Sequence, residues 1–294
     1  MPLCLNSHPI SVRPANWKKL PGELGQTANK CAKRDVSRDV HFVLLRDAVG
    51  RKNDFRSARR RLLNAFFQEA LNRVDLATDT LTINISEMAQ ALSKTLKTVV
   101  DTETGEESSR IVDAKVPECR IARLVNEVII PFGLAYVVGG NEDNPQFGKM
   151  WDKTHGIWFP KILVLTDTFY RIAGANMEKL HAQREQHQEY RNIGLTTEGS
   201  EESVISVRHA RETIRRRMFK AAWEKRKRHS ARTRLTEKLE GMSFDDAKYE
   251  ITKRALSSMS ESERIEVLPE ELNSRVFQIL YDHNIYPPNT PPSH

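Results

Sequence analysis

A run of positive charge between residues 208 and 234 constrains this chain more than any other feature. The run reads RHARETIRRRMFKAAWEKRKRHSARTR and holds 12 Lys and Arg residues against two acids, for a formal charge of +10. The whole chain of 294 residues carries only +7, so the rest of the protein sums to −3. Charge gathered in one place creates a local field that attracts a polyanion, and nucleic acid is the polyanion that a basic protein most often binds.

A helix through this run would carry cations on almost every side. A solvated helix usually mixes both signs at a spacing of four residues, and this one mostly does not, so in isolation it repels itself. DNA phosphates would relieve the repulsion, and binding should then weaken steeply as salt is added. A basic surface helix that binds nothing is the alternative interpretation. The predicted DNA contacts in the run are Arg211, Arg215, Arg216, Arg217, Lys220, Lys225, Arg226, Lys227, Arg228, Arg232 and Arg234.

The overall composition suits a soluble globular protein, with 39% hydrophobic and 29% charged residues. The sequence contains no run of about 18 apolar residues and no apolar segment that resembles a secretory signal, so we expect no membrane partner. Its three cysteines, Cys4, Cys31 and Cys119, are odd in number and widely spaced. They predict neither a disulfide framework nor a metal knuckle, and a reducing, cytoplasmic location fits best.

The motifs of common enzyme classes are missing. Gly148 and Lys149 lack the other residues of a P-loop, and His181 and His187 are spaced wrongly to share a helical face. No Gly-x-Ser-x-Gly, HExxH or EF-hand sequence is present. We therefore expect no catalytic residues, no metal and no cofactor, although carboxylates from distant positions could still form a cluster.

The first half of the chain predicts a helix, a strand and a second short helix. Residues 57–75 repeat apolar side chains at three- and four-residue steps, as an amphipathic helix does. Arg59, Arg60 and Arg61 crowd its first turn, where the helix dipole disfavours cations. They are candidate anion contacts, and a solvated surface cluster is the alternative. Residues 80–85 alternate like a strand, and Ser86 is expected to cap a helix over residues 87–92.

The clearest helix of this half covers residues 118–130, directly after Pro117. Its apolar residues define one buried face, and its other face carries three candidate DNA contacts, Arg120, Arg123 and Asn126. A hairpin is expected before it, from strands near residues 98–100 and 110–112. Two strand-like runs follow, residues 134–138 and 156–165.

This order of elements is the order of a winged helix-turn-helix, in which the second helix of the pair enters the DNA major groove. A generic mixed domain could give the same order. Helices are also expected over residues 176–192, through the basic run, and over residues 243–258 and 268–283. Aromatic residues make up only 7% of the chain and do not alternate with basic residues, which favours duplex DNA over single strands or RNA.

The sequence therefore predicts an α+β, predominantly helical protein. A winged helix-turn-helix domain is followed by a basic C-terminal domain that is helical or a second winged helix. The predicted divisions are a loosely ordered N-terminal arm (1–40), a winged-helix DNA-binding domain (41–175), a helical linker (176–202), a basic C-terminal DNA-binding domain (203–283) and a Pro-rich tail (284–294).

Two stretches of the chain resemble a known family. The segments FGLAYVV and GIWFPKILVLTDTFYRIAG, and further on ETIRRRMFKAAWEKRKRHSARTRL, are similar to the RepA-type replication initiators of IncFII and related enterobacterial plasmids. The similarity covers roughly residues 57 to 255. An insertion at residues 94–115 and a long wing loop at residues 139–155 depart from the compact members of the family.

The resemblance implies a non-enzymatic protein that binds the duplex DNA of its own plasmid origin. Such a protein promotes the opening of an AT-rich region and helps to recruit the host replication initiator and the replicative helicase. The resemblance leaves open whether the protein associates with itself on DNA. The helix at residues 118–130 would be its recognition helix. Two other functions stay open: a winged-helix transcriptional repressor without DNA-melting activity, and a rolling-circle nicking enzyme, which needs a nucleophilic Tyr and a metal.

Overall fold

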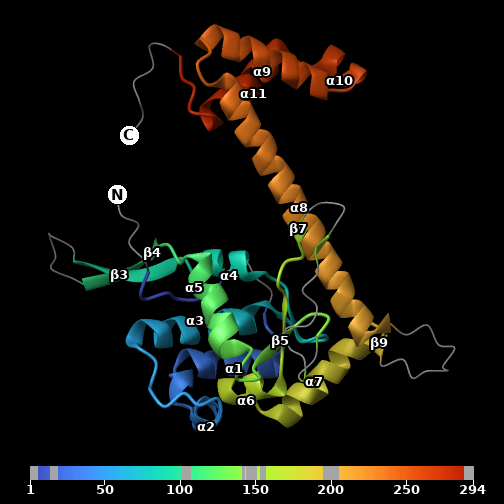
Figure 1. Ribbon diagram of the computed structural model, residues 1–294. Coiled ribbons are helices and arrows are strands. Elements are labelled where there is room, and N and C mark those ends of the chain that lie inside the picture. Colours follow the sequence, from blue (N-terminus) through green and yellow to red (C-terminus); the bar gives the residue numbers. More distant parts are fainter. Residues whose placement is uncertain are drawn as a thin grey trace. The chain divides into compact units, whose positions relative to one another are not determined.

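The computed structural model describes residues 6–13, 19–100, 107–140, 143, 151–152, 157–194 and 205–287. It divides into two compact units, Met1–Ala222 and Trp223–His294 (Figure 1). Most described residues are helical, and the strands are short and form small sheets. The prediction of an α+β, predominantly helical protein is therefore confirmed.

The first unit contains all of the strands among the described residues. Its helices are α1 (Gly22–Ala32), η1 (Val36–Arg38), α2 (Val40–Ala48), α3 (Ser57–Arg73), α4 (Ile85–Ala91), α5 (Glu118–Leu124), η2 (Val125–Ile129), α6 (Asp167–Ala173), α7 (Met177–Tyr190) and the start of α8 (Val207–Leu239). Its strands are β1 (Val74–Asp75), β2 (Thr80–Leu81), β3 (Lys94–Val100), β4 (Glu107–Asp113), β5 (Ala135–Val137), β6 (Trp151–Asp152), β7 (Ile157–Trp158), β8 (Leu163–Leu165), β9 (Ile193–Gly194) and β10 (Ile205–Ser206).

The central sheet of the first unit has the strand order β1-β2-β8-β5, and every neighbouring pair is antiparallel. Strand β8 is buried on both faces because its side chains alternate between two apolar clusters. Leu163 and Leu165 lie in the main core, whereas Val164 lies in a smaller cluster with Val138 and Ile162. Met218 of α8 packs against this smaller cluster, so the start of α8 covers the second face of the sheet.

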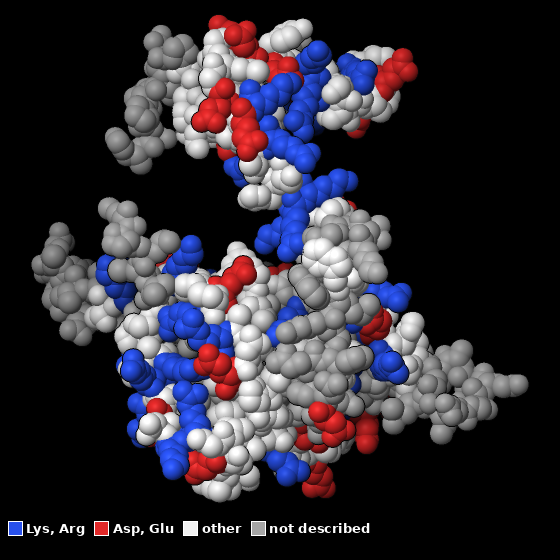
Figure 2. Space-filling model, viewed as in Figure 1, with Lys and Arg blue, Asp and Glu red and all other residues white. Residues whose placement is uncertain are grey.

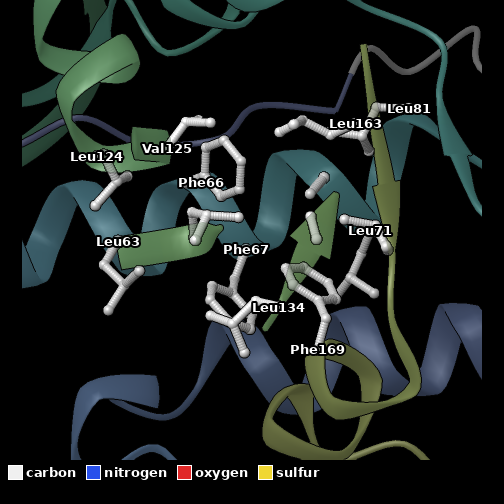
Figure 3. Close-up of a cluster of buried hydrophobic side chains, with 14 of the residues drawn as sticks. Leu63, Phe66, Phe67, Leu71, Leu81, Leu124, Val125, Leu134, Leu163 and Phe169 are labelled. Atoms are coloured by element: carbon white, nitrogen blue, oxygen red, sulfur yellow. The ribbon is translucent and has the colours of Figure 1, made fainter. Parts of the chain in front are cut away.

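Helix α3 provides the centre of the main core (Figure 3). Its apolar residues fall on successive turns and are buried, as the sequence predicts. The rings of Phe67 and Phe169 stack with their centroids 4.2 Å apart and join α3 to α6. Leu124 and Val125, at the end of α5, pack into the same cluster. The core thus holds α5 by one face and leaves its other face to solvent.

Helix α4 begins at Ile85, two residues before the predicted start, and its N-cap is Asn84, so the predicted cap Ser86 is wrong. Asn84 accepts a hydrogen bond from the Glu87 backbone N–H, and the Glu87 side chain accepts one from the Asn84 backbone N–H. This reciprocal pair satisfies two backbone donors at the start of the helix. The hairpin expected from strands near residues 98–100 and 110–112 is confirmed, and its strands are longer than predicted, because β3 and β4 pair along their whole length with Leu96 opposite Ile111.

The helix predicted over residues 118–130 changes its geometry partway. Residues 118–124 are α-helical, and residues 125–129 form a π-helical turn in which the Ile130 N–H donates to the Val125 carbonyl 3.0 Å away. A π-turn contains one extra residue and so widens the face that a helix can bury. Here Val128, Ile129 and Ile130 are all buried in succession. A regular helical period in the sequence could not show this turn.

The prediction of a loosely ordered N-terminal arm is wrong for the described part of residues 1–40. Helix α1 packs against α3, α6 and α7, and Leu24 and Cys31 are buried in the main core. The buried Glu23 carboxylate accepts a hydrogen bond of 2.7 Å from the Asn176 backbone N–H at the start of α7. Pro21 is the N-cap of α1, and Gly22 and Gly25 lie within the helix.

The turn between β1 and β2, residues 76–79, connects three helices to the sheet. Asp79 is only 7% exposed; its carboxylate accepts a hydrogen bond of 3.0 Å from the Tyr170 hydroxyl and forms an ion pair with the Arg184 guanidinium, also at 3.0 Å. The Thr78 carbonyl accepts from Arg211 Nε at 2.8 Å. Helix α7, predicted to be part of a linker, and the start of α8, predicted to be part of the second domain, therefore belong to the first unit. Residues 195–202 and most of the predicted wing loop lie outside the described residues.

The second unit is helical throughout its described residues, 223–287. It contains the end of α8, α9 (Phe244–Ser258), α10 (Glu261–Glu266) and α11 (Pro269–Asp282). A small core of Leu235, Leu239, Ala247, Ile251, Val276 and Leu280 joins these helices. These residues contain no strand, so they match the helical version of the prediction and not a second winged helix. Residues 288–294 of the predicted tail lie outside the description.

The stability of the fold should depend on pH through Asp79. Burial raises the pKa of this carboxyl from 3.8 to about 6, against the opposing effect of Arg184. Between about pH 4 and 6 the folded protein therefore holds a proton that the unfolded chain has released. This contribution to the free energy of unfolding is complete below about pH 4 and is lost as the pH rises through 6.

Asp79→Asn should remove this contribution, because Asn does not titrate and tolerates the positive φ of 55° at this position. Urea denaturation of the full chain measures the free energy of unfolding at several pH values. As the pH rises from about 4 to 7, this free energy should fall by on the order of 1–3 kcal/mol more in the wild type than in the variant. Parallel curves for the two proteins would mean that Asp79 titrates normally.

Candidate nucleic-acid interface

The solvent-facing side of α5 and its π-turn carries polar side chains in a row. Ile121, Leu124 and Val125 are buried, whereas Arg123 and Asn126 are exposed, and the Arg123 side chain is 69% exposed. A helix that is held by its apolar face in this way presents a rigid polar face to a binding partner. Arg123 and Asn126 therefore lie on the exposed face of this helix.

Cations from three segments of the first unit meet around Glu127. Arg59, at the start of α3, donates a 2.6 Å hydrogen bond to the Glu127 carboxylate, and Arg123 lies 3.9 Å from it. The guanidinium groups of Arg51 and Arg59 lie over the ring of Phe55, at 4.5 and 5.3 Å from its centroid. We call Arg51, Phe55, Arg59, Arg123 and Glu127 the Glu127 cluster. Its cations, Arg59 foremost, hold the pKa of Glu127 below its usual value.

Lys161 extends this surface. Its ammonium group donates a 2.7 Å hydrogen bond to the side-chain oxygen of Asn126. Lys161 comes from the segment before β8, so the surface combines residues of α3, α5 and the sheet. Figure 2 shows Lys and Arg side chains gathered on this face of the unit with isolated acidic side chains among them.

Three of the predicted DNA contacts in this unit lie outside the surface around Glu127. Arg120 is half-buried and donates a 2.6 Å hydrogen bond to the Asn6 carbonyl, so it holds the N-terminal segment in place. Arg60 lies 3.8 Å from the Asp35 carboxylate, and its Nε is buried. Arg61 lies 2.8 Å from the His8 ring. Of the three consecutive arginines of α3, the structure brings only Arg59 to the exposed face of α5.

The first two predicted DNA contacts of α8, Arg211 and Arg215, instead contact other parts of the first unit. Arg211 Nη1 donates to the Tyr136 hydroxyl at 2.8 Å, in addition to its bond to the Thr78 carbonyl. Arg215 is only 3% exposed and lies 4.8 Å from the centroid of the Phe159 ring. The ring of Phe159 also stacks on Phe219, with centroids 4.2 Å apart. These contacts attach the start of α8 to the sheet.

The other predicted contacts of α8 are exposed (Figure 2). Arg216 lies 3.5 Å from Glu212 but remains 77% exposed, and Arg232 donates a 2.5 Å hydrogen bond to the Asp282 carbonyl. The predicted contacts that are exposed on the helix are Arg216, Arg217, Lys220, Lys225, Arg226, Lys227, Arg228, Arg232 and Arg234. They line a helix of 33 residues, so the exposed part of α8 carries the concentrated charge that the sequence indicates.

Sequence reasoning did not identify Arg51, Lys161 or Glu127 as members of this interface. Arg59 and Glu127 are 68 positions apart, and Asn126 and Lys161 are 35 apart. No periodic pattern links residues at such separations. The only available signal was Glu127 itself, an acid on the polar face of a helix otherwise rich in candidate contacts.

The described part of the chain contains no group of three or more His, Cys, Asp or Glu side chains arranged to hold a metal ion. Among the same residues, no helix combines the length and apolar character needed to cross a bilayer. Cys31 is buried, which raises its pKa to about 12, and Cys119 is exposed at the start of α5.

These features define a protein with a polar, cation-flanked helix face on one unit and a long basic helix. A model of the IncFII RepA protein family matches residues 2–285, and the chain belongs to that family. The family resemblance inferred from the sequence is therefore confirmed.

Several relatives carry names related to replication. A replication initiation protein of Escherichia coli is 28% identical over 295 residues, which cover 95% of this chain and 81% of that protein. A second replication initiation protein of Escherichia coli is 28% identical over 265 residues, which cover 85% of this chain and 71% of that protein. A probable replication-associated protein repA1 of Buchnera aphidicola subsp. Schizaphis graminum is 24% identical over 275 residues, 92% of this chain and 90% of that protein. No solved structure matches the chain.

The different environments of neighbouring arginines in α8 predict different effects on stability. Arg215→Ala should lower the free energy of unfolding by about 2 kcal/mol, because it removes a buried cation from the Phe159 ring and from Glu212. Arg216→Ala should change it by less than about 0.5 kcal/mol, because that side chain is exposed. Urea denaturation of the full chain compares the two variants. Equal losses would show that Arg215 does not anchor α8.

Proposed function

We propose that this chain is a plasmid replication initiator that binds the duplex DNA of its origin sequence-specifically. The match over residues 2–285 to the IncFII RepA family supports this role, as do relatives named replication initiation proteins. The structural observation that carries the DNA-binding part is the exposed face of α5 with Arg123 and Asn126, flanked by cations of α3 and the sheet.

The topology around α5 supports a winged-helix mode of binding. The chain order α3, β2, α4, α5, β5 and β8 is that of a winged helix, and the strand after the first helix pairs with the last strand, β2 with β8 and β8 with β5. In such a domain the last helix, here α5, enters the major groove. Arg123 has the chemistry to contact a guanine and Asn126 that to contact an adenine.

The exposed cations of α8 supply a second, less specific contact. Phosphate contacts set the register and orientation of a protein on DNA, whereas contacts to base edges read the sequence. Arg217, Lys220 and the run from Lys225 to Arg228 are suited to phosphates because they are exposed and crowded. Six such contacts give a slope of roughly −5 when log K is plotted against log salt.

The remaining parts of the proposal concern events after binding. We propose that the protein promotes opening of an AT-rich region next to its site, helps to recruit the host replication initiator and helicase, and acts without enzymatic chemistry in the bacterial cytoplasm. The names of the relatives support an initiator over a repressor.

The test uses the full chain and supercoiled DNA that carries the adjacent plasmid origin. A gel-shift assay should show that origin DNA competes far better than scrambled DNA of equal length, and permanganate should then modify thymines beside the bound site. Equal competition by scrambled DNA would overturn specific binding. Specific binding without reactive thymines would identify a repressor, and nicked DNA in the presence of Mg²⁺ or Mn²⁺ would identify an enzyme.

Arg123 should contribute to specificity. Arg123→Ala should weaken binding to origin DNA by about 1–3 kcal/mol and relax the preference at one base pair, if its guanidinium contacts a guanine. Arg38→Ala is the matched control, because Arg38 is an exposed cation of η1 that lies 3.8 Å from Asp35 and is not among the cations around Glu127. Competition assays with single-base variants of the site measure both effects. Equal losses on origin and scrambled DNA would instead make Arg123 a phosphate contact.

A further inference from the structure

Glu127 is an acid in the middle of a surface that is otherwise suited to DNA. It lies one turn beyond Arg123 on the exposed face of α5 and η2, and its side chain is 46% exposed. Arg59 reaches it at 2.6 Å and Arg123 at 3.9 Å. The two arginines best placed to contact DNA on this face therefore already share a carboxylate in the free protein.

The surface beside Glu127 is hollowed and carries more positive charge. The hollow lies between the segment that joins α2 to α3 and the end of η2, and it is lined by Arg51, Lys52, Glu127 and Phe132 among others. Arg51 also lies over Phe55, on the same ring as Arg59. Cations thus approach Glu127 from the α2–α3 segment, from the start of α3 and from α5.

A carboxylate and a phosphate present similar anionic oxygens, and arginine binds both with the same paired donors. We propose that, in the free protein, Glu127 occupies the place of a DNA backbone phosphate on Arg59, and that any bound duplex must displace it. Arg123 is the more distant partner of Glu127 and keeps the base contact proposed above. This inference rests on the proposed DNA-binding function and adds to it a residue that opposes binding. None of the predicted contacts has that role.

The consequence is a lower affinity for DNA of any sequence. DNA must break the Arg59–Glu127 pair before it can use these cations, and the Glu127 carboxylate then lies close to the phosphates. Exposed ion pairs contribute little, so the effect amounts to at most about fivefold in affinity. An initiator competes with a large excess of non-specific sites, so a device that weakens arbitrary binding keeps more protein free for the origin.

The test compares two charge-equivalent variants of one helix. Glu127→Gln removes one negative charge from η2 and Glu118→Gln removes one from the start of α5, where Glu118 lies beside Ser86. Binding of the full chain to a random-sequence duplex is measured by fluorescence anisotropy at several salt concentrations. Thermal melts by circular dichroism check that the variants fold, which we expect because both side chains are exposed.

Glu127→Gln should bind the random duplex about three- to fivefold more tightly than the wild type and show a steeper salt slope by about 1, as one more phosphate is neutralised. Glu118→Gln should change affinity by less than about twofold. In an Arg59→Ala background the effect of Glu127→Gln should shrink, since the cation that it releases is gone.

Equal effects of the two variants would overturn the inference, because only the overall charge would then matter. The same titration is run on an origin duplex, and a loss of affinity of Glu127→Gln confined to that duplex would overturn the inference as well, since Glu127 would then contact a base. If the wild type itself binds no duplex at any salt concentration, the proposed function fails, and the inference fails with it.

Discussion

The buried turn between β1 and β2 is the constraint on which the first unit depends. A buried carboxylate is costly without partners, and Asp79 obtains them from Tyr170 of α6 and Arg184 of α7. The neighbouring Thr78 carbonyl binds Arg211 of α8. One turn of four residues thus joins the edge of the sheet to helices that lie more than 90 positions further along the chain.

This arrangement divides the cations of α8 by role. Arg211 and Arg215 lie where α8 meets the sheet. Arg211 donates to a carbonyl and a hydroxyl, and Arg215 contacts an aromatic ring and one glutamate. Apart from Arg208 in the first turn, the exposed cations of the helix begin at Arg216. The same sequence run therefore contains both the anchor that orients the helix and the charge that is free to meet a polyanion. Charge counting cannot separate the two, because the separation depends on which side of the helix the sheet covers.

The exposed face of α5 shows a similar combination of support and function. The π-turn allows Val128, Ile129 and Ile130 to be buried in succession, so the end of the helix is held firmly while Asn126 and Glu127 remain outside. The cations that flank them come from α3 and from the segment before β8. A polar surface assembled on elements with buried anchors is rigid before it binds, which lowers the entropy cost of recognition.

The sequence by itself determined the local features: the amphipathic helix α3, the paired strands β3 and β4, the long basic α8 and the family. Helical and strand periods are properties of neighbouring residues, so they can be read without a structure. Only the tertiary structure decided that α1 is part of the core, that Arg215 is buried and that Arg59 meets Glu127. These outcomes depend on contacts between residues far apart in the chain, and whether an arginine is an anchor or an exposed charge depends on what packs against it.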